Sequence, residues 1–200
     1  MGFPVVHDVP MRAIAPGELL RSPGAGTASG GVSLRLVTLE DVTDRYVGWL
    51  EDAEVNAYLE TRYAPQTLES VHAFVVSMVE SPHSYLFAIV ENASDRHVGN
   101  VKIGPVNPRH LFADVSYFIG ERAAWGKGYG TEAVRLVTQF GFERLGLHRC
   151  QAGLYESNVG SQRVLEKAGY TYDGRLAKQL RTGDAWEDHV WFGALNETWR

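Results

Sequence analysis

The most informative stretch of the sequence is Trp125-Gly126-Lys127-Gly128-Tyr129-Gly130-Thr131-Glu132-Ala133. It places three glycines between an apolar run, residues 115–119, and a pattern of apolar residues at helical spacing. The first backbone N–H groups of a helix lack partners and carry partial positive charge, so they bind anions well. Glycines permit positive φ and a close approach of the main chain to a ligand. The stretch therefore predicts either a phosphate-binding helix start or a tight strand-to-helix turn.

A second element lies downstream. An apolar strand pattern over 150–155 leads into Glu156-Ser157-Asn158-Val159-Gly160-Ser161-Gln162-Arg163-Val164-Leu165-Glu166-Lys167-Ala168-Gly169-Tyr170. Together the two elements resemble the acetyl-CoA site of the GNAT acetyltransferase superfamily, a [Q/R]-x-x-G-x-[G/A] loop followed by an N-x-x-S/A helix that ends in K-x-G-[F/Y]. Within it the sequence is similar to the branch of ribosomal-protein N-terminal, sugar and small-amine acetyltransferases. The resemblance runs from about residue 32 to the C-terminus.

Two positions depart from the family pattern. Trp125 stands where the loop usually begins with Gln or Arg, so packing would replace one side-chain contact to the diphosphate. Leu165 stands where many relatives carry the tyrosine that protonates the leaving thiolate. That role must therefore pass to another group or to water.

Composition bounds the remaining possibilities. A chain of 200 residues fits one domain with a substantial core. We predict a flexible or loosely packed N-terminal extension over residues 1–31, rich in small and turn-prone residues, and the acetyltransferase domain over 32–200. The single Cys150 excludes an internal disulfide and favours the cytoplasm. A net charge of −5, with the Lys and Arg residues scattered, predicts that the protein has no nucleic-acid partner. The sequence has no apolar run long enough to cross a membrane, so we expect no membrane span.

Periodicity predicts the order β-α-α-β-β-β-α-β-α-β-β of strands and helices. The order is that of the GNAT fold, so the expected class is α/β (α+β), with a mixed, largely antiparallel sheet of about seven strands, a splay between strands 4 and 5, and about four helices. The helices are expected at 38–50, near 65–78, at 131–145 with Gly146 as C-cap, and at 158–167. The strands are expected at 32–37, 85–91, 98–106, 113–119, 149–155, 170–176 and 188–195.

The resemblance implies an acetyl-CoA site without a metal. The pantetheine arm would pair with backbone groups of Tyr117, Phe118 and Ile119. Asn158 would hydrogen-bond the pantetheine or a water near the thioester, although Asn is also a favoured helix N-cap, and both roles can coexist. Lys167 belongs to the same motif. The residues expected to hold the diphosphate are Trp125, Gly126, Lys127, Gly128, Tyr129, Gly130 and Thr131.

Acetyl transfer to an amine requires a proton acceptor for the amine and a proton donor for the thiolate. Ser161 lies one helical turn after Asn158 and is either that donor or a packing residue. Asp114 and Glu156 are the candidate general bases, or else solvated carboxylates. His110 is a further candidate because histidine titrates near neutral pH.

The expected acceptor wall contains Tyr58 and Arg62 between the first two helices, and Asn100 and Lys102 on the third strand. Arg62 would grip a phosphate or carboxylate, or simply pair with Glu60. The sequence therefore favours an acetyl-CoA-dependent N-acetyltransferase. Its expected acceptor is a small-molecule amine, with an amino sugar or sugar nucleotide first, or a protein N-terminus; a homodimer is a further option. The alternative is an acyl-CoA-binding regulatory module without turnover.

Overall fold

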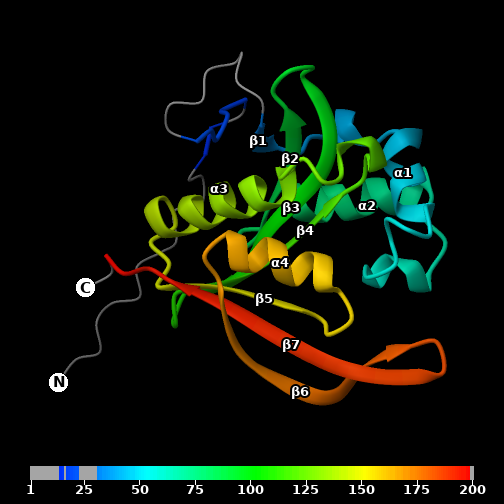
Figure 1. Ribbon diagram of the computed structural model, residues 1–200. Coiled ribbons are helices and arrows are strands. Elements are labelled where there is room, and N and C mark those ends of the chain that lie inside the picture. The colour runs from blue at the N-terminus through cyan, green and yellow to red at the C-terminus, as the bar shows by residue number, and fades with distance from the viewer. Residues whose placement is uncertain (1–13, 16, 23–30, 199–200) are drawn as a thin grey trace.

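The computed structural model describes residues 14–15, 17–22 and 31–198. One seven-stranded sheet has the order β1-β2-β3-β4-β5-β7-β6 (Figure 1). The strands are β1 (Val32–Leu36), β2 (Tyr85–Glu91), β3 (Arg96–Asn107), β4 (Phe112–Ile119), β5 (Arg149–Tyr155), β6 (Thr171–Thr182) and β7 (Ala185–Leu195). The helices are α1 (Asp44–Glu51), α2 (Leu68–Val79), α3 (Tyr129–Glu143) and α4 (Val159–Lys167), with short 3-10 turns η1 (Leu39–Asp41), η2 (Glu60–Tyr63) and η3 (Arg122–Ala124). The predicted fold class is confirmed.

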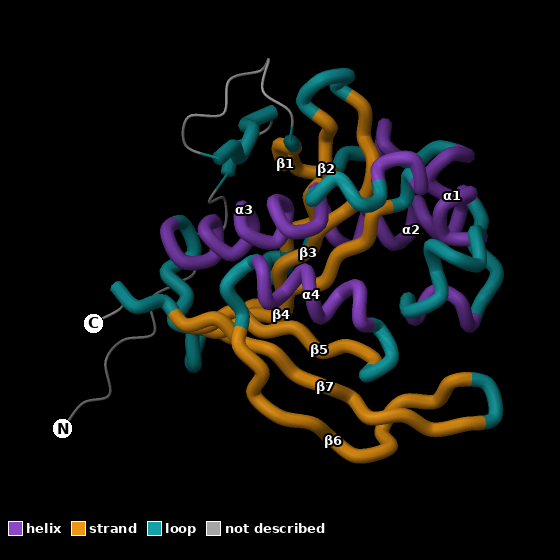
Figure 2. Tube along the Cα trace, in the orientation of Figure 1, coloured by secondary structure: helices purple, strands orange, loops and turns teal. Residues whose placement is uncertain are grey.

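Helices lie on both faces of the sheet (Figure 2), and each face carries a hydrophobic core. On one face α3 buries Val134, Val137 and Phe140 against the strands, beside Leu165 of α4. On the other face α1 and α2 form a smaller core with β2. Side chains alternate along a strand, so neighbouring residues of β4 and β5 serve opposite faces.

Strands β4 and β5 form the one parallel pair of the sheet, and their pairing is short. It runs from Phe112 opposite Arg149 to Asp114 opposite Gln151. Beyond this point β4 continues to Ile119 beside β3, and β5 continues to Tyr155 beside β7. The two strands therefore separate in the middle of the sheet, as predicted, and this gap in the backbone pairing between β4 and β5 is called the opening below.

Several elements differ in extent from the prediction, and the C-cap of α3 is Arg144 rather than Gly146. The helix expected from residue 38 begins as the turn η1, and α1 starts only at Asp44, where the Thr43 hydroxyl accepts a hydrogen bond from the Tyr46 N–H. The interruption follows from Asp41, whose buried carboxylate is held by Arg35. The last two strands are longer than expected and form a hairpin that turns between Thr182 and Ala185.

Most of residues 1–31 lie outside the described part of the chain. Within the described part, Ile14 is buried in the larger core, and the Leu20 backbone exchanges two hydrogen bonds with Leu34 of β1. Glu18 forms an ion pair of 3.0 Å with Arg144 after α3. The domain boundary at residue 31 stays a prediction. Among the described residues, no helix is both long and apolar enough to cross a membrane.

Candidate active site

The glycine-rich loop ends at the first residue of α3. Gly126 and Gly128 have φ of +76° and +84°, which is the left-handed region that favours glycine. A Cβ atom built on either residue meets nothing within 4 Å, so the outer side of the loop is open. Gly130 differs, because its Cβ would come within 3.2 Å of the Tyr117 ring. Two glycines thus leave room at the helix start, and the third lets α3 pack on β4.

Trp125 fastens this loop to the sheet. Its indole Nε1–H donates a hydrogen bond of 2.8 Å to the carbonyl oxygen of Ile119, at the end of β4. The indole ring is 43% exposed. The residue that replaces the usual Gln or Arg therefore bonds to the protein's own backbone. The same bond occupies the Ile119 carbonyl, one of the strand groups expected to pair with pantetheine.

A carboxylate lies behind the loop. Glu91 of β2 accepts a hydrogen bond of 2.7 Å from the Tyr129 hydroxyl and lies 3.4 Å from Lys127 Nζ. Hydrogen bonds from Ser94, Tyr129 and Lys127 lower the pKa of Glu91 to about 2. Burial and the neighbouring Glu91 carboxylate raise the pKa of Tyr129 to about 12. Glu91 is thus ionised, and its negative charge partly offsets the positive charge of Lys127. Thr131, the last residue of the predicted loop, is half-buried in the first turn of α3.

The start of α4 faces β4. The Asn158 side chain caps α4 by accepting the Ser161 N–H at 3.1 Å. The Ser161 hydroxyl lies 2.9 Å from the Tyr117 hydroxyl. Burial raises the pKa of Tyr117 to about 12, against the opposing effect of the Ser161 bond. Two protonated hydroxyls therefore lie together where α4 faces β4. Leu165, which stands where many relatives carry a tyrosine, is buried in the larger core.

Lys167 lies at the other end of α4. Its side chain is exposed, and its main-chain carbonyl accepts a hydrogen bond from Arg135 of α3. The contact joins the two helices through backbone rather than through the lysine ammonium group.

Asp114 lies on the opposite face, where β4 and β5 part. Its Oδ1 accepts a hydrogen bond of 2.8 Å from Gln151 Nε2. The half-buried Lys102 lies opposite Ser116 and shares this face. Glu156, after β5, has its carboxylate 3.8 Å from Arg175 Nη1, and both side chains are more than half exposed. His110 is an exposed residue of the turn between β3 and β4.

A wall of polar and aromatic groups covers the end of β5 on the same face. Tyr155 donates a hydrogen bond of 2.7 Å to Glu60 of η2. The Arg62 guanidinium lies 4.6 Å from the ring centre of Tyr155 and 4.8 Å from that of Tyr63. The Tyr58 hydroxyl donates to the Ser157 carbonyl at 3.2 Å. Tyr58 and Arg62, expected from sequence to belong to one wall, are indeed close together.

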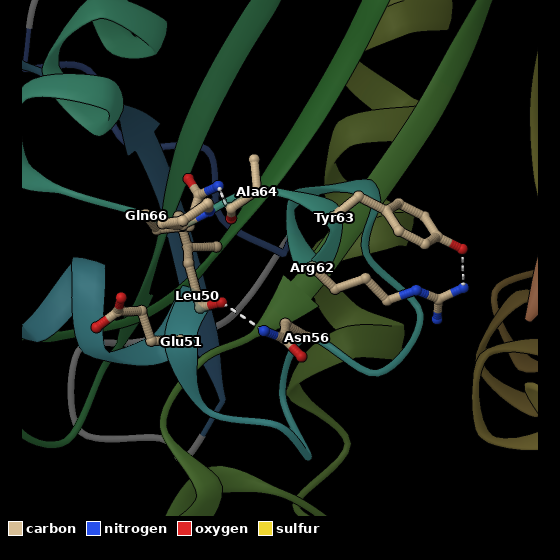
Figure 3. Close-up of a pocket in the computed structure, with 8 residues that line it drawn as sticks. Leu50, Glu51, Asn56, Arg62, Tyr63, Ala64 and Gln66 are labelled. Atoms are coloured by element: carbon tan, nitrogen blue, oxygen red, sulfur yellow. Dashed lines mark hydrogen bonds between the residues drawn. The ribbon is translucent and has the colours of Figure 1, made fainter. Parts of the chain in front are cut away.

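The stem of Arg62 also lines a surface hollow of about 320 Å³ between the end of α1 and η2. Figure 3 shows Arg62 and Tyr63 extended side by side, with their hydrogen bond of 2.7 Å. Asn56 crosses the hollow to the Leu50 carbonyl at 2.6 Å. Arg62 and Tyr63 therefore belong both to the lining of this hollow and to the wall beside Tyr155.

Asn100 is a correction to the expected acceptor surface. It is 2% exposed, and its Oδ1 lies 2.6 Å from Nε2 of the buried His97. Its side chain is part of a polar network in the smaller core, beside Tyr46 and Asp41. Asn100 is on the predicted face of the sheet, but α1 covers it. The alternating pattern of a strand indicates which residues share a face, but it does not indicate which helix covers that face.

Three groups at this opening were not predicted. They are the Tyr117 hydroxyl, the Glu60–Tyr155 pair, and His189 of β7, which lies beside Tyr155 in the strand register. His189 falls in an alternating strand pattern, which marks one face of the strand. Nothing in the sequence places residue 60 beside residue 155, because that contact depends on how η2 folds over the sheet.

Comparison with known proteins agrees with this geometry. The family profile for the acetyltransferase (GNAT) domain matches residues 32–171. The chain belongs to the GNAT acetyltransferase family. Among curated GNAT relatives, the probable N-acetyltransferase YjcK of Bacillus subtilis is 40% identical over 119 residues, which are 59% of this chain and 65% of YjcK. The match thus spans just under two thirds of that relative's length.

Two solved structures share the fold. The ribosomal-protein-S5-alanine acetyltransferase of Vibrio fischeri has a TM-score of 0.69 at 23% identity, covering 84% of this chain and 95% of that one. The spermidine N-acetyltransferase of Vibrio cholerae, in complex with CoA and spermine, has a TM-score of 0.73 at 16% identity, covering 82% and 95%. The predicted GNAT membership is confirmed. Among the residues that the structure describes, no group of three or more His, Cys, Asp or Glu side chains is placed to hold a metal.

Proposed function

We propose that the protein transfers the acetyl group of acetyl-CoA to a primary amine. The observation that carries this proposal is the opening between β4 and β5, with an open helix start on one face and a polar, aromatic wall on the other. A coenzyme and an amine can approach such an opening from opposite sides, and holding two reactants in line removes much of the entropic barrier.

The residues of the loop fit a diphosphate. The open space outside Gly126 and Gly128, the free N–H groups of the first turn of α3 and the Lys127 ammonium together suit an anion. Thr131 adds a hydroxyl in the same turn. The backbone of Tyr117 and Phe118 remains for an amide-bearing arm, whereas Trp125 already occupies the Ile119 carbonyl. When bound, acetyl-CoA supplies an activated thioester.

Three side chains are proposed for proton transfer. Ser161 would donate a proton to the leaving sulfur, with Tyr117 holding its hydroxyl in place. Asp114 and Glu156 would accept the amine proton directly or through water. The separation of the groups suits these roles, because Ser161 lies on the α4 face of the sheet and Asp114 on the other.

A small-molecule amine is the proposed acceptor, with an amino sugar or sugar nucleotide first and a protein N-terminus next. Tyr58, Tyr155 and Arg62 offer stacking surfaces and one cationic fork, which suit a compact polar substrate. Because α1 covers Asn100, the third strand contributes Lys102 alone to the expected acceptor wall. The spermidine and ribosomal-protein enzymes named above show that this fold serves both classes.

The test is a thiol-release assay with purified protein, acetyl-CoA and a panel of glucosamine, spermidine and a peptide with a free N-terminal alanine. Amine-dependent release of CoA thiol is the expected result. Coenzyme binding measured by calorimetry without release for any amine would favour the alternative, an acyl-CoA-binding regulatory module. Absence of coenzyme binding would overturn both.

A further inference from the structure

His189 lies where the sheet opens. It pairs with Tyr155 across β5 and β7, and it projects on the face that carries Tyr155 and the wall around Arg62. The pairing of β4 with β5 ends at Gln151, so the β5 residues 152–155 have β7 on one side and no β4 partner on the other. The β5 segment around Gly153 therefore borders the opening, and His189 of β7 lies directly across that segment from it.

Gly153 lets the ring lean over β5. A Cβ atom built on Gly153 would overlap His189 Nε2 and lie 3.1 Å from the Trp191 ring. The ring centres of His189 and Trp191 are 4.7 Å apart, so the indole packs against the imidazole beside Gly153. Any larger residue at 153 would displace Nε2 from the opening.

The tautomer of His189 is fixed by Gln179 of β6. Nδ1 lies 2.6 Å from Gln179 Oε1. An amide oxygen only accepts hydrogen bonds, so Nδ1 carries the proton and Nε2 keeps its lone pair. The nitrogen over Gly153 is thus the one that can accept a proton.

The charges around His189 come from several elements. Burial lowers the pKa of His189, and the carboxylates of Glu60 in η2 and Asp114 in β4 partly oppose this effect. Glu187 lies two residues earlier on the same face of β7, where it accepts the Ser157 N–H at 2.9 Å, and Arg62 is the cation of the wall. The imidazole is therefore neutral near pH 7 and has two carboxylates nearby that stabilise its charged form.

We propose that His189 Nε2 accepts the proton of the acceptor ammonium group. The inference rests on the proposed function and deepens it. One proton passes from the ammonium to Nε2 and later to water. The amine nitrogen then bonds to the thioester carbon as the carbon–sulfur bond breaks, and a second proton from this nitrogen goes, by way of Ser161 or water, to the sulfur. The products are an acetamide, a thiol and one released proton.

The two carboxylates suit this role less well. Asp114 Oδ1 already accepts a bond from Gln151, and Glu156 is turned toward Arg175 at an exposed position. Asp114 instead supports the imidazolium once it forms. A neutral histidine with a fixed tautomer is also the better match in pKa, since a general base works best near the operating pH.

The experiment measures kcat/KM against pH for the best amine of the panel. We expect His189→Gln to lower kcat by about 10²–10⁴-fold and to remove the acidic limb of the profile, while calorimetry shows unchanged affinity for CoA. His72→Gln, at an exposed site of α2, is the matched control and should behave like the wild type. Wild-type turnover and an unchanged limb in His189→Gln would overturn the inference.

A second variant covers the case in which His189→Gln does not fold. Gln179→Glu places a carboxylate on Nδ1–H at an exposed position, so it should raise the pKa of His189 and move the acidic limb to higher pH. NMR titration of the imidazole nitrogens in the free protein should show the same shift. A shift in the NMR titration without any shift of the limb would exclude His189 as the base. Failure of the wild type to release thiol with any amine would instead count against the proposed function.

Discussion

The two sides of the opening between β4 and β5 are built in different ways. On the α3 and α4 side, the groups proposed to bind the coenzyme come from two continuous stretches, 125–131 and 158–161, and many of them are backbone groups. On the other side the groups proposed for the acceptor come from η2, β4, β5 and β7, and they are side chains such as Glu60, Tyr155 and His189. A backbone site depends on glycine at a few positions, whereas a side-chain site depends on the identity of each residue.

This difference separates a coenzyme site built mainly from backbone groups from an acceptor site built mainly from side chains. A diphosphate is recognised by helix N–H groups that any residue supplies, provided that glycine permits the approach. An amine is recognised by the particular charges and rings beside it. Variants on one side should therefore change coenzyme affinity, and variants on the other side should change acceptor use.

The largest effect is expected from Gly128→Asp. The new carboxylate would stand in the open space at the start of α3, repel a diphosphate and strain a residue with φ of +84°. We expect calorimetry to show a loss of CoA affinity of at least about 100-fold, or roughly 2.8 kcal/mol. The control is Gly146→Asp, because Gly146 also has positive φ, +66°, and open space, but lies beyond the other end of α3. Equal CoA affinity in both variants would show that the loop does not hold the phosphates.

Ser161→Ala should have the next largest effect. Removal of the hydroxyl leaves helix propensity high and changes little volume. If Ser161 protonates the sulfur, kcat should fall by roughly ten- to a thousandfold with nearly constant CoA affinity, the pattern for a group that acts in the transition state. Tyr117→Phe keeps the ring against Gly130 and removes only the partner hydroxyl, so a loss of about tenfold is expected. Unchanged kcat in both variants would mean that water supplies the proton.

Sequence reasoning predicted the fold well because local patterns specify it. The strand patterns, the glycines at 126 and 128 and the cap at Asn158 each act within a few residues, and the structure follows them. The prediction failed where a distant partner decides the local conformation. The helix expected from residue 38 is interrupted because Asp41 serves Arg35 of β1, and β6 continues to Thr182 because β7 pairs with it.

The same contrast holds for the site. The conformation of the loop at 126–128 could be predicted from the sequence, since its neighbours in the chain are also its neighbours in space. Asn100 and His189 lie on strands whose facing residues were predictable, yet α1 covers the first and the opening exposes the second. Which strand residues are accessible depends on the covering helices and on where β4 and β5 part, and neither follows from spacing.

Arg62→Met should affect the acceptor side alone. The guanidinium lies between the rings of Tyr63 and Tyr155, and its loss should loosen the wall and raise the KM for the amine by about three- to tenfold. The affinity for CoA should stay constant. Arg45→Met is the matched control, because Arg45 also stacks on an aromatic ring, that of Trp49 in the smaller core, which is not part of the wall. A change in CoA affinity in Arg62→Met would contradict the division between the two sides.

Asp41→Asn should lower stability without changing the binding of coenzyme or amine, because Asp41 lies in η1 and bonds only groups of the fold. Its carboxylate is bonded by Arg35 at 2.6 and 2.7 Å and by the Thr38 N–H at 2.8 Å. Loss of these charge-assisted bonds should lower the free energy of unfolding at pH 7 by about 1.5–3 kcal/mol in urea titrations. Coenzyme affinity and the KM for the amine should match the wild type.

The pH dependence of this difference gives the sharper test. Burial raises the pKa of Asp41, but the bonds from Arg35 and Thr38 outweigh burial, so its pKa in the folded protein is lowered. A carboxylate with a lowered pKa stabilises the fold above its unfolded pKa of 3.8, and this stabilisation disappears as the pH falls through the folded value. The gap in unfolding free energy between wild type and Asp41→Asn should therefore be constant from pH 7 to about 5 and narrow below pH 4. A gap that persists at low pH would show that the asparagine disturbs packing, and that the charge of Asp41 contributes little to stability.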